Sequence, residues 1–392
     1  MMDGLVIYEM KPISLTLDRV GPFRDKPYCV DFTDESGEPC NVFMLISKNG
    51  SGKTTVLDVL ASLYGMLELD PHEAIRFGQE DLDEGNGRAQ LDLRVRLSWN
   101  GEDLTIILSL LAGELGPEVS LKVWADDDLN AINADSWHRF GYRRVSSGRL
   151  SAISKADELA LDITSVVRNS FGSRPDGQFE GNTLTLPTAL FFSAYRDIPP
   201  IKSSPGSAGS KRGIAEPNHW GYSSLQRFNP HSDDWEDSLD NLLVWLKWLD
   251  DGRFEKAREI INDRAFSDSS KVLLDVRRDP PEAVVRCNSD DEQEHRLDRL
   301  SSGEKSLAYL FLRIGAHITQ NSIILIDELD IHLHIRWQHK LVNELKALVA
   351  KNPGLVVIMT THSTEILDVY SNSLKVSEDG LIKGGHIITN MQ

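Results

Sequence analysis

A glycine-rich loop at residues 47–54 has the residue types that can hold a chain of phosphate groups. It reads Ser-Lys-Asn-Gly-Ser-Gly-Lys-Thr. Glycines let successive backbone amides turn inward around phosphate oxygens, and the start of a following helix adds the positive end of its dipole. Lys53 would then reach the outer phosphates, and the Thr54 hydroxyl would bind Mg²⁺. The alternative is a glycine-rich turn without a ligand.

The segments on either side of this loop favour the phosphate-binding interpretation. Residues 42–46 are wholly apolar and predict a buried strand, and apolar residues from Val56 onward recur at helical spacing. Strand, glycine loop and helix is the context that the motif requires. Ser47 stands where the usual pattern has glycine. The expected nucleotide contacts are Asn49, Gly50, Ser51, Gly52, Lys53, Thr54 and Thr55.

A second run, residues 323–328, is an apolar strand that ends in Asp327 and Glu328. Ligands of open parallel sheets lie at the carboxyl ends of the strands. Adjacent strand residues point in opposite directions, so the two carboxylates can take different roles. Asp327 would hold Mg²⁺, and Glu328 would act as the general base on water. The alternative is a strand end with two solvated acids.

Two further segments complete the set. Leu-Ser-Ser-Gly-Glu at residues 300–304 precedes an expected helix and is both a capping box and a candidate anion site at a helix N-terminus. Its candidate residues are Ser301, Ser302, Gly303 and Glu304. His362 follows the strand predicted at 355–359, in the context Thr-Thr-His-Ser.

Together, in this order, the four segments resemble those of ABC-type ATPases of the SMC, RecF and overcoming-lysogenisation-defect (OLD) group, which are often called AAA family ATPases. The resemblance covers about residues 1–110 and 285–375. It implies binding and hydrolysis of ATP with Mg²⁺. It also implies a homodimer or a higher even-numbered oligomer, in which the 300–304 signature of one chain caps the γ-phosphate held by the other.

The same resemblance assigns three more roles. His362 corresponds to a switch histidine that senses the γ-phosphate, and Asp330 falls at the D-loop, which signals across the dimer. Gln79 corresponds to a glutamine that contacts Mg²⁺ or the attacking water, although a plain loop glutamine is the alternative.

The predicted fold is an α/β ABC-type P-loop NTPase head, with a mixed β-sheet core flanked by helices and an inserted, mainly helical subdomain. Residues 1–110 would form the first part of the head, and residues 286–392 would form the second part with the signature, the two carboxylates and His362. Residues 111–285 would be the largely helical insert, with a mobile loop at 199–222 that is rich in Pro, Ser, Gly and Lys. The Asn100-Gly101 pair predicts a hairpin between strands at 91–98 and 104–110.

Composition limits the classes of protein that fit. The 392 residues are 40% hydrophobic and 26% charged, which is ordinary for a globular protein. No apolar run reaches the roughly 18 residues of a membrane span, and no secretory signal is recognised, so we expect a cytoplasmic protein without a membrane partner. Three cysteines without a CxxC pair argue against a disulfide scaffold or a zinc site. His332 and His334 resemble a metal-binding pair, but the resemblance to the ATPase family implies histidines just after the carboxylates, so we do not expect a zinc site there.

The formal net charge of −18 requires any nucleic-acid contact to use a local basic patch. The best candidate patch is Arg139, Arg143, Arg144 and Arg149, and a solvated basic loop is the alternative. Tyr195-Arg196, after the strand predicted at 189–193, could bring an arginine to the active site or to DNA, or could pair with an acid.

The chain ends about thirty residues after His362, too few for the Toprim nuclease domain of OLD-type relatives, so we expect a separate, nuclease-like effector protein. The leading hypothesis is an ATP-driven conformational switch that controls this effector, in a bacterial anti-phage system. The alternatives are a RecF- or SMC-like DNA-repair ATPase, the nucleotide-binding subunit of a transporter, and an ATP-gated scaffold that does not hydrolyse ATP.

Overall fold

The structure of the protein is a computed structural model. The structure describes residues 4–69, 76–116, 120–144, 150–153, 157–174, 179, 184–199, 213–228, 234–267, 269–287, 293–331, 333–363, 366 and 381–388.

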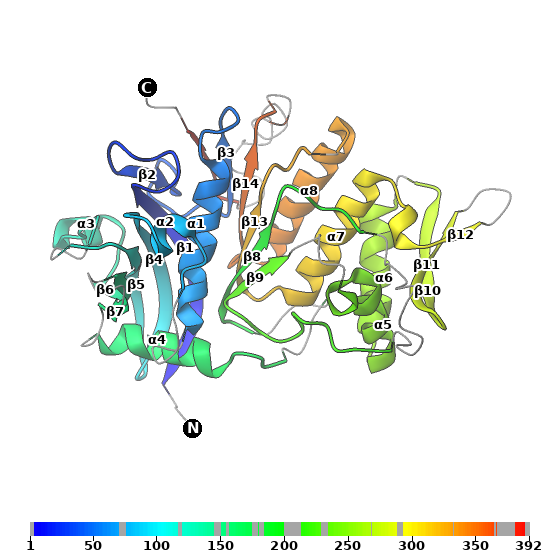
Figure 1. The fold of residues 1–392 in the computed structure, drawn as a ribbon. Coiled ribbons are helices and arrows are strands. Elements are labelled where there is room, and N and C mark those ends of the chain that lie inside the picture. Colours follow the sequence, from blue (N-terminus) through cyan, green and yellow to red (C-terminus); the bar gives the residue numbers. More distant parts are fainter. Residues whose placement is uncertain are drawn as a thin grey trace.

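A parallel six-stranded sheet forms the centre of the molecule (Figure 1). Its strand order is β15-β3-β14-β13-β8-β9, and every neighbouring pair is parallel. The strands are β3 (Val42–Ile46), β8 (Pro187–Phe192), β9 (Leu225–Phe228), β13 (Asn321–Ile326), β14 (Val356–Thr361) and β15 (Lys383–Ile387). Because parallel strands bring their carboxyl ends to one edge, the loops after β3, β8, β13 and β14 meet there.

A second six-stranded sheet has the order β2-β1-β4-β5-β6-β7 and is antiparallel except for the parallel pair β5 and β6. Its strands are β1 (Leu5–Asp18), β2 (Tyr28–Asp31), β4 (Arg88–Trp99), β5 (Glu102–Gly113), β6 (Ser136–Arg144) and β7 (Leu150–Ala152). A third, antiparallel sheet consists of β10 (Lys271–Arg278), β11 (Pro281–Cys287) and β12 (Glu294–His295).

Helices cover the sheets. The α-helices are α1 (Lys53–Gly65), α2 (Glu80–Asp83), α3 (Asp126–Ala131), α4 (Glu158–Asn169), α5 (Leu239–Leu249), α6 (Arg253–Ile260), α7 (Ser302–His317) and α8 (Ile335–Lys351). The short helices are the 3₁₀ turns η1 (Met66–Glu68), η2 (Trp235–Asp237) and η4 (Leu297–Arg299), and the π-helical turn η3 (Ile261–Ala265). Among the described residues, no helix is both long and apolar enough to cross a membrane.

The parallel sheet separates two hydrophobic cores. Alternate residues of β13 and β14 belong to different cores, because successive strand side chains point to opposite faces. Ile323 and Leu325 pack in the core that contains the apolar side of α1. Ile324 and Ile326 pack in the core that contains α7 and α8. The helix after the phosphate loop and the helix after the signature therefore lie on opposite faces of the sheet (Figure 1).

Most of the predicted elements are present. The strands expected at 42–46, 323–326 and 355–359 are β3, β13 and β14, and the Asn100-Gly101 turn joins β4 to β5 with positive φ at both residues (53° and 85°). Those angles suit the two-residue turn that matches the twist of a hairpin. The α/β head with helices on both faces of its core sheet agrees with the predicted fold class.

The middle of the chain contains more sheet than expected. Residues 111–285 hold α3 to α6, but β6 and β7 extend the antiparallel sheet, while β8 and β9 extend the parallel one. The Pro187–Phe192 strand is buried along its whole length, so it needs a packed layer on both faces and is found inside the sheet. The expectation of a largely helical insert is therefore corrected for these strands, and the domain boundaries at 110 and 286 stay a prediction.

The loop predicted to be mobile at 199–222 includes residues 200–212, which lie outside the described part of the chain. Its last part is packed, because Trp220 and Tyr222 are 2% and 4% exposed. The Tyr222 hydroxyl donates a hydrogen bond to the Pro187 carbonyl at 2.7 Å. Burial of these two rings fixes a stretch whose composition alone suggested mobility.

Candidate active site

The phosphate loop begins where β3 ends and finishes at the first turn of α1. Gly50 and Gly52 have φ of 77° and 100°, a region that favours glycine. A Cβ atom at Gly52 would lie 2.7 Å from the side chains of Phe23 and Pro22, so space as well as backbone angle requires glycine there. Ser47 is not among the described residues with positive φ, so serine at this position is unstrained.

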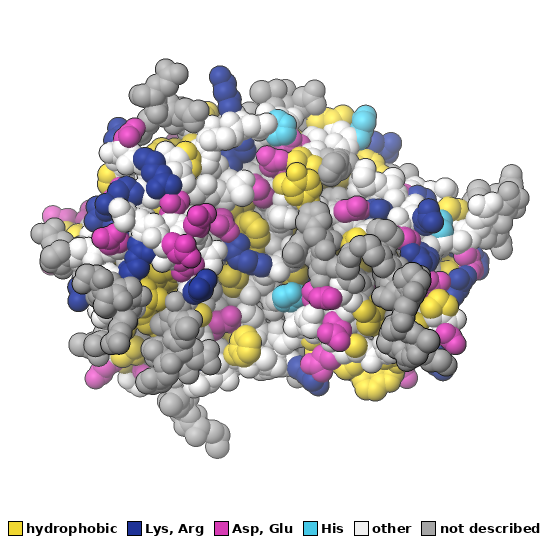
Figure 2. All heavy atoms as spheres, viewed as in Figure 1, with side chains coloured by type: hydrophobic (Ala, Val, Ile, Leu, Met, Phe, Trp, Pro, Cys, Tyr) yellow, Lys and Arg dark blue, Asp and Glu magenta, His cyan; other side chains and the backbone are white. Residues whose placement is uncertain are grey.

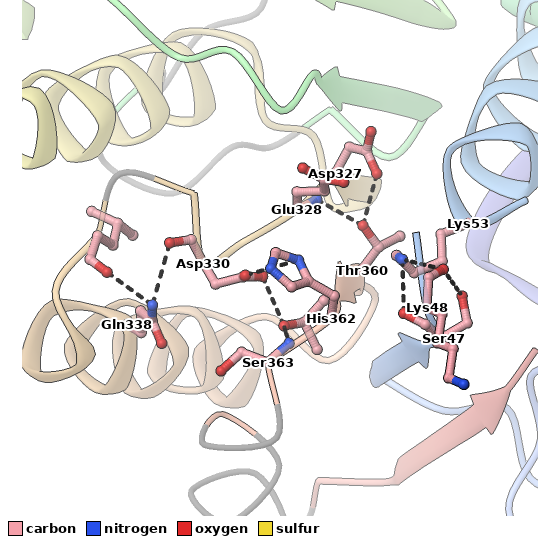
Figure 3. Close-up of polar contacts among 12 residues, drawn as sticks. Ser47, Lys48, Lys53, Asp327, Glu328, Asp330, Gln338, Thr360, His362 and Ser363 are labelled. Carbon is pink, nitrogen blue, oxygen red and sulfur yellow. Dashed lines mark hydrogen bonds and ion pairs between the residues drawn. The ribbon is translucent and has the colours of Figure 1, made fainter. Parts of the chain in front are cut away.

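The ammonium group of Lys53 is turned into the loop. Its Nζ atom donates to the carbonyl oxygens of Ser47 at 2.9 Å and Lys48 at 3.2 Å (Figure 3). Lys53 is only 4% exposed, and its charge is held among carbonyl dipoles at the inside of the loop. A cation in this place, beside amides at a helix N-terminus, suits the phosphates of a nucleotide.

Asp327 and Thr54 meet across the sheet edge. The Thr54 hydroxyl donates to Asp327 Oδ2 at 2.8 Å, and the Asp327 amide donates to the Phe192 carbonyl at 2.9 Å, where β8 ends. Hydroxyl and carboxylate oxygens are the hard ligands that Mg²⁺ takes together with waters and phosphate oxygens. The two residues predicted to share Mg²⁺ therefore lie in contact and have suitable donor atoms.

Glu328 lies in a constrained turn directly after Asp327. Its φ of 44° is in the left-handed region. This conformation costs a non-glycine residue free energy, so it persists only where contacts with the surrounding structure hold it. Its amide donates to the Thr360 hydroxyl at 2.7 Å, and that hydroxyl donates to Asp327 Oδ1 at 2.7 Å (Figure 3). One threonine of β14 thus fixes both carboxylate residues.

His362 follows β14 and is paired with Asp330. Its Nδ1 atom lies 3.1 Å from Asp330 Oδ2, and the Thr361 hydroxyl donates to Asp330 Oδ1 at 2.7 Å. The Gln338 side chain donates to the Asp330 carbonyl at 3.3 Å (Figure 3). The imidazole remains partly exposed, with 43% of its side chain accessible, so it is oriented from behind while its other edge faces outward.

The predicted signature segment forms the N-terminus of α7. Ser301 is the N-cap residue, and its side chain accepts from the Glu304 amide while Glu304 Oε2 accepts from the Ser301 amide at 2.9 Å. Lys271 donates to the same carboxylate at 2.6 Å. Burial raises the pKa of Glu304, but the hydrogen bonds from Lys271 and Ser301 outweigh it and lower the pKa below its usual value. Both the capping box and an exposed helix N-terminus are therefore present, with Ser301 and Ser302 exposed.

Within one chain, the phosphate loop and the signature lead into helices on opposite faces of the parallel sheet. Ser301 caps α7, and Ser302 and Gly303 are the first residues of this helix. In the described part of the chain, no hydrogen bond joins residues 301–303 to residues 47–55. The structure brings together Lys53, Thr54, Asp327, Glu328 and the 360–362 segment, but not the signature.

Gln79 is not placed in this group. It is the N-cap of α2, and its Oε1 atom accepts from the Leu82 amide at 2.9 Å.

The loop that does lie beside the carboxylates follows β8, the strand next to β13, and contains Ser193 and Arg196. The Arg196 guanidinium donates to the Asp327 carbonyl at 2.6 Å. The sequence signal for the position of this loop was the apolar strand before Ser-Ala-Tyr-Arg. Neighbouring parallel strands bring their carboxyl ends to one edge of the sheet, so this loop would lie beside the carboxylates.

The basic patch is partly engaged with other protein groups. Arg144 donates to the Asp83 carbonyl at 2.6 Å, and the Arg139 guanidinium lies over the Trp137 ring at 5.1 Å. Arg149 lies outside the described residues. On the face shown in Figure 2, Lys and Arg side chains lie among Asp and Glu side chains. His332 is also outside the described part, and within that part no cluster of three or more His, Cys, Asp or Glu residues suits a metal ion.

Parts of the chain are similar to known proteins. Residues 188–368 match a family model described as "AAA domain, putative AbiEii toxin, Type IV TA system". A stretch of 113 residues, 26% of this chain, is 32% identical to "Septu protein PtuA" of Bacillus thuringiensis. A stretch of 95 residues, 21% of this chain, is 35% identical to "Retron Vc95 probable ATPase" of Vibrio cholerae serotype O1 biovar El Tor.

These matches span 27% of the Septu protein and 18% of the retron protein, well under two thirds of either relative. A solved structure of an SMC head, bound to the C-winged helix domain of ScpA, superposes over 92% of this chain and 91% of its own, with a TM-score of 0.40 and 13% identity. The family match includes the signature, Asp327, Glu328 and His362, and the Thr54–Asp327 contact joins the phosphate loop to it. Residues 188–368 of the chain are therefore similar to an AAA-domain family.

Proposed function

We propose that this protein binds ATP with Mg²⁺ at the edge of the parallel sheet and hydrolyses it to ADP and phosphate. The contact between Thr54 and Asp327 carries the proposal, because it brings a phosphate loop and a magnesium-binding carboxylate together at 2.8 Å. Lys53 and the loop amides of Asn49 to Thr55 would hold the phosphates. Thr54 and Asp327 would bind Mg²⁺, whose charge polarises the phosphate oxygens.

Glu328 would act as the general base. Its amide is held by Thr360, which supports this role because it fixes the backbone from which the carboxylate projects. In this role it accepts a proton from the water that attacks the γ-phosphate. His362, oriented by Asp330, would contact the γ-phosphate and report its presence. Gln79 remains a candidate Mg²⁺ contact only if α2 moves from its present position.

The active unit in this proposal is a homodimer or a higher even-numbered oligomer. Ser302 and Gly303 are exposed or half-exposed at the start of a helix, on the other face of the sheet from α1. Exposed amides and hydroxyls at a helix N-terminus suit an anion. A two-fold arrangement lets the signature of each chain cap the nucleotide on its partner. ATP would then hold two copies together until hydrolysis separates them.

The biological role that we propose is a conformational switch that controls a separate, nuclease-like effector in anti-phage defence, in the cytoplasm. The similarity of part of the chain to a Septu protein and to a probable retron ATPase supports this role. ATP-dependent closing and opening of a dimer is a two-state change, which an effector can detect through a surface present in only one state.

Two variants test the proposal. Glu328→Gln should lower the rate of ATP hydrolysis about 10²–10⁴-fold while ATP binding remains, because only the base is lost. Lys53→Ala should abolish nucleotide binding, because the loop loses its cation. Unchanged turnover in Glu328→Gln, with Lys53→Ala inactive, would contradict the assignment of the base.

A further inference from the structure

Arg196 is a buried cation that faces the backbone of the catalytic turn. It is 2% exposed, and its guanidinium donates to the carbonyl oxygens of Asp327 at 2.6 Å and Glu328 at 2.9 Å. It also donates to the Ser193 carbonyl at 2.9 Å and, through Nε, to the Ser306 hydroxyl at 3.2 Å. Almost its whole hydrogen-bonding capacity is used within the protein.

The partners of this guanidinium are unusual for a buried charge. In the described part of the chain, no carboxylate lies within 4.0 Å of Arg196, so it is balanced by carbonyl dipoles and by the more distant charges of Asp327, Asp330 and Glu328. Burial lowers the pKa of Arg196 to about 10, which still leaves it charged at neutral pH. Taking an arginine out of water without a close ion pair is costly, which favours a role that only a rigid, multivalent donor can fill.

That role is visible in the geometry of the turn. Glu328 has a φ of 44°. The carbonyl groups before and after its Cα atom, those of Asp327 and Glu328, both accept hydrogen bonds from the Arg196 guanidinium. The amide of Glu328 is held by Thr360 from another strand. With its amide and both carbonyls bound, the residue has one backbone conformation, and its carboxylate is directed by that conformation.

The same loop is attached to the signature helix. Ser306, which accepts from Arg196, and Lys305, which lies 2.9 Å from Asp197, are in the first turn and a half of α7. Two neighbouring contacts thus connect residues 196–197 to the helix that begins at Ser302. Displacement of the N-terminus of α7 would change the donor position of Arg196 and, through it, the turn at 327–328.

We propose that Arg196 is a positioning residue for Glu328, and that through Ser306 it makes hydrolysis at one site depend on the placement of the same chain's signature helix. This inference rests on the proposed function, because it assigns Glu328 to the chemical step. It also gives the two composite sites of a dimer a physical connection, since each chain supplies Glu328 to one site and Ser302 to the other.

The test compares Arg196→Lys, Arg196→Met and Ser306→Ala with the unmodified chain, using steady-state ATP hydrolysis, binding of a fluorescent ATP analogue and thermal unfolding. We expect Arg196→Met to lower kcat about 100-fold and Ser306→Ala about 10-fold, as loss of hydrogen bonds to a charged group implies. The affinity for the analogue should change less than about 3-fold, because these groups do not contact the nucleotide. Arg196→Lys should recover part of kcat, since it keeps the charge but not the fork of donors.

Ser322→Ala is the matched control. Ser322 is also a fully buried serine, but it lies at the start of β13, away from Asp327. Its hydroxyl accepts a hydrogen bond from the Thr319 amide. It should lower the unfolding temperature as Ser306→Ala does and leave kcat unchanged. If Ser306→Ala behaves like Ser322→Ala, or if Arg196→Met loses turnover and binding together without rescue by lysine, the inference is wrong.

A failure of the proposed function gives a different result. If the unmodified chain does not hydrolyse ATP, or if Glu328→Gln keeps full activity, the assignment of the base fails, and the inference fails with it. If Glu328→Gln is inactive, and Arg196→Lys and Ser306→Ala keep the kcat of the unmodified chain, only the positioning role of Arg196 is excluded.

Discussion

The hydroxyl of Thr360 donates to the carboxylate of Asp327 at 2.7 Å, and so links β14 to the residue that follows β13. The same oxygen accepts from the Glu328 amide. Thr360 is fully buried, so both contacts are made away from water, where an unsatisfied group is costly. The threonine lies two residues before His362, so the segment that carries the expected phosphate sensor also holds the two acidic residues.

Thr360→Val should lower kcat about 10–100-fold while preserving the shape of the side chain. It removes the hydrogen bond to Asp327 and leaves the half-buried amide of Glu328 without its acceptor. Steady-state kinetics and circular dichroism would measure activity and folding. Thr360→Ser is the control, because it retains the hydroxyl, and it should keep most of the activity. Equal activity of the valine and serine variants would show that this hydroxyl has no role.

Asp330→Asn should weaken the orientation of His362. Asparagine can keep the hydrogen bond from Thr361 at one oxygen, but its amide group replaces the oxygen that lies 3.1 Å from His362 Nδ1. We expect kcat to fall about 10-fold with ATP affinity nearly unchanged. A variant that loses ATP affinity but keeps kcat would instead place Asp330 in ground-state binding.

Asp240 gives a prediction for stability. Burial raises the pKa of its carboxyl group to about 6 in the folded protein, above the unfolded value of 3.8, although the Ala283 amide donates to it. The folded state therefore holds the proton more tightly, and stability is lost as the pH rises from about 4 to about 6. Asp240→Asn removes this ionisation and keeps an acceptor for Ala283.

The Asp240→Asn variant should have a free energy of unfolding higher than the unmodified chain by up to about 3 kcal/mol near pH 7.5, with a much smaller difference near pH 4.5. Urea unfolding at both pH values measures this. A variant that is less stable at both pH values would mean that the carboxylate is solvated or paired when ionised.

Nucleic acid should not be a strong activator. Arg144 already bonds to the Asp83 carbonyl, and the chain carries a net charge of −18. We expect duplex DNA at about 0.15 M salt to leave ATP hydrolysis unchanged, and charge reversal at Arg143 and Arg144 to have no effect on it. DNA-stimulated hydrolysis that disappears in the double variant would favour the repair-type alternative.

The sequence predicted the β3 strand and the β4–β5 turn because each has a strong local signal. Val42–Ile46 is wholly apolar, and Asn100-Gly101 has the angles that its residue types favour. The position of Gln79 could not be predicted, since its side chain caps a short helix whose place depends on contacts distant in sequence. Arg196 was visible as a candidate, but its carbonyl partners at Asp327 and Glu328 follow from the pairing of β8 with β13, which no local pattern specifies.

We propose that nucleotide joins two copies of the chain through Ser302, and the mass of the Glu328→Gln variant in solution measures this association. Light scattering should show the mass doubling, or rising to a higher even multiple, on addition of ATP and Mg²⁺. Adding Ser302→Glu should prevent this increase, because an acid suits a helix N-terminus but repels a phosphate. A mass that stays at one chain at saturating nucleotide, or one that doubles equally in the Ser302→Glu variant, would contradict the claim.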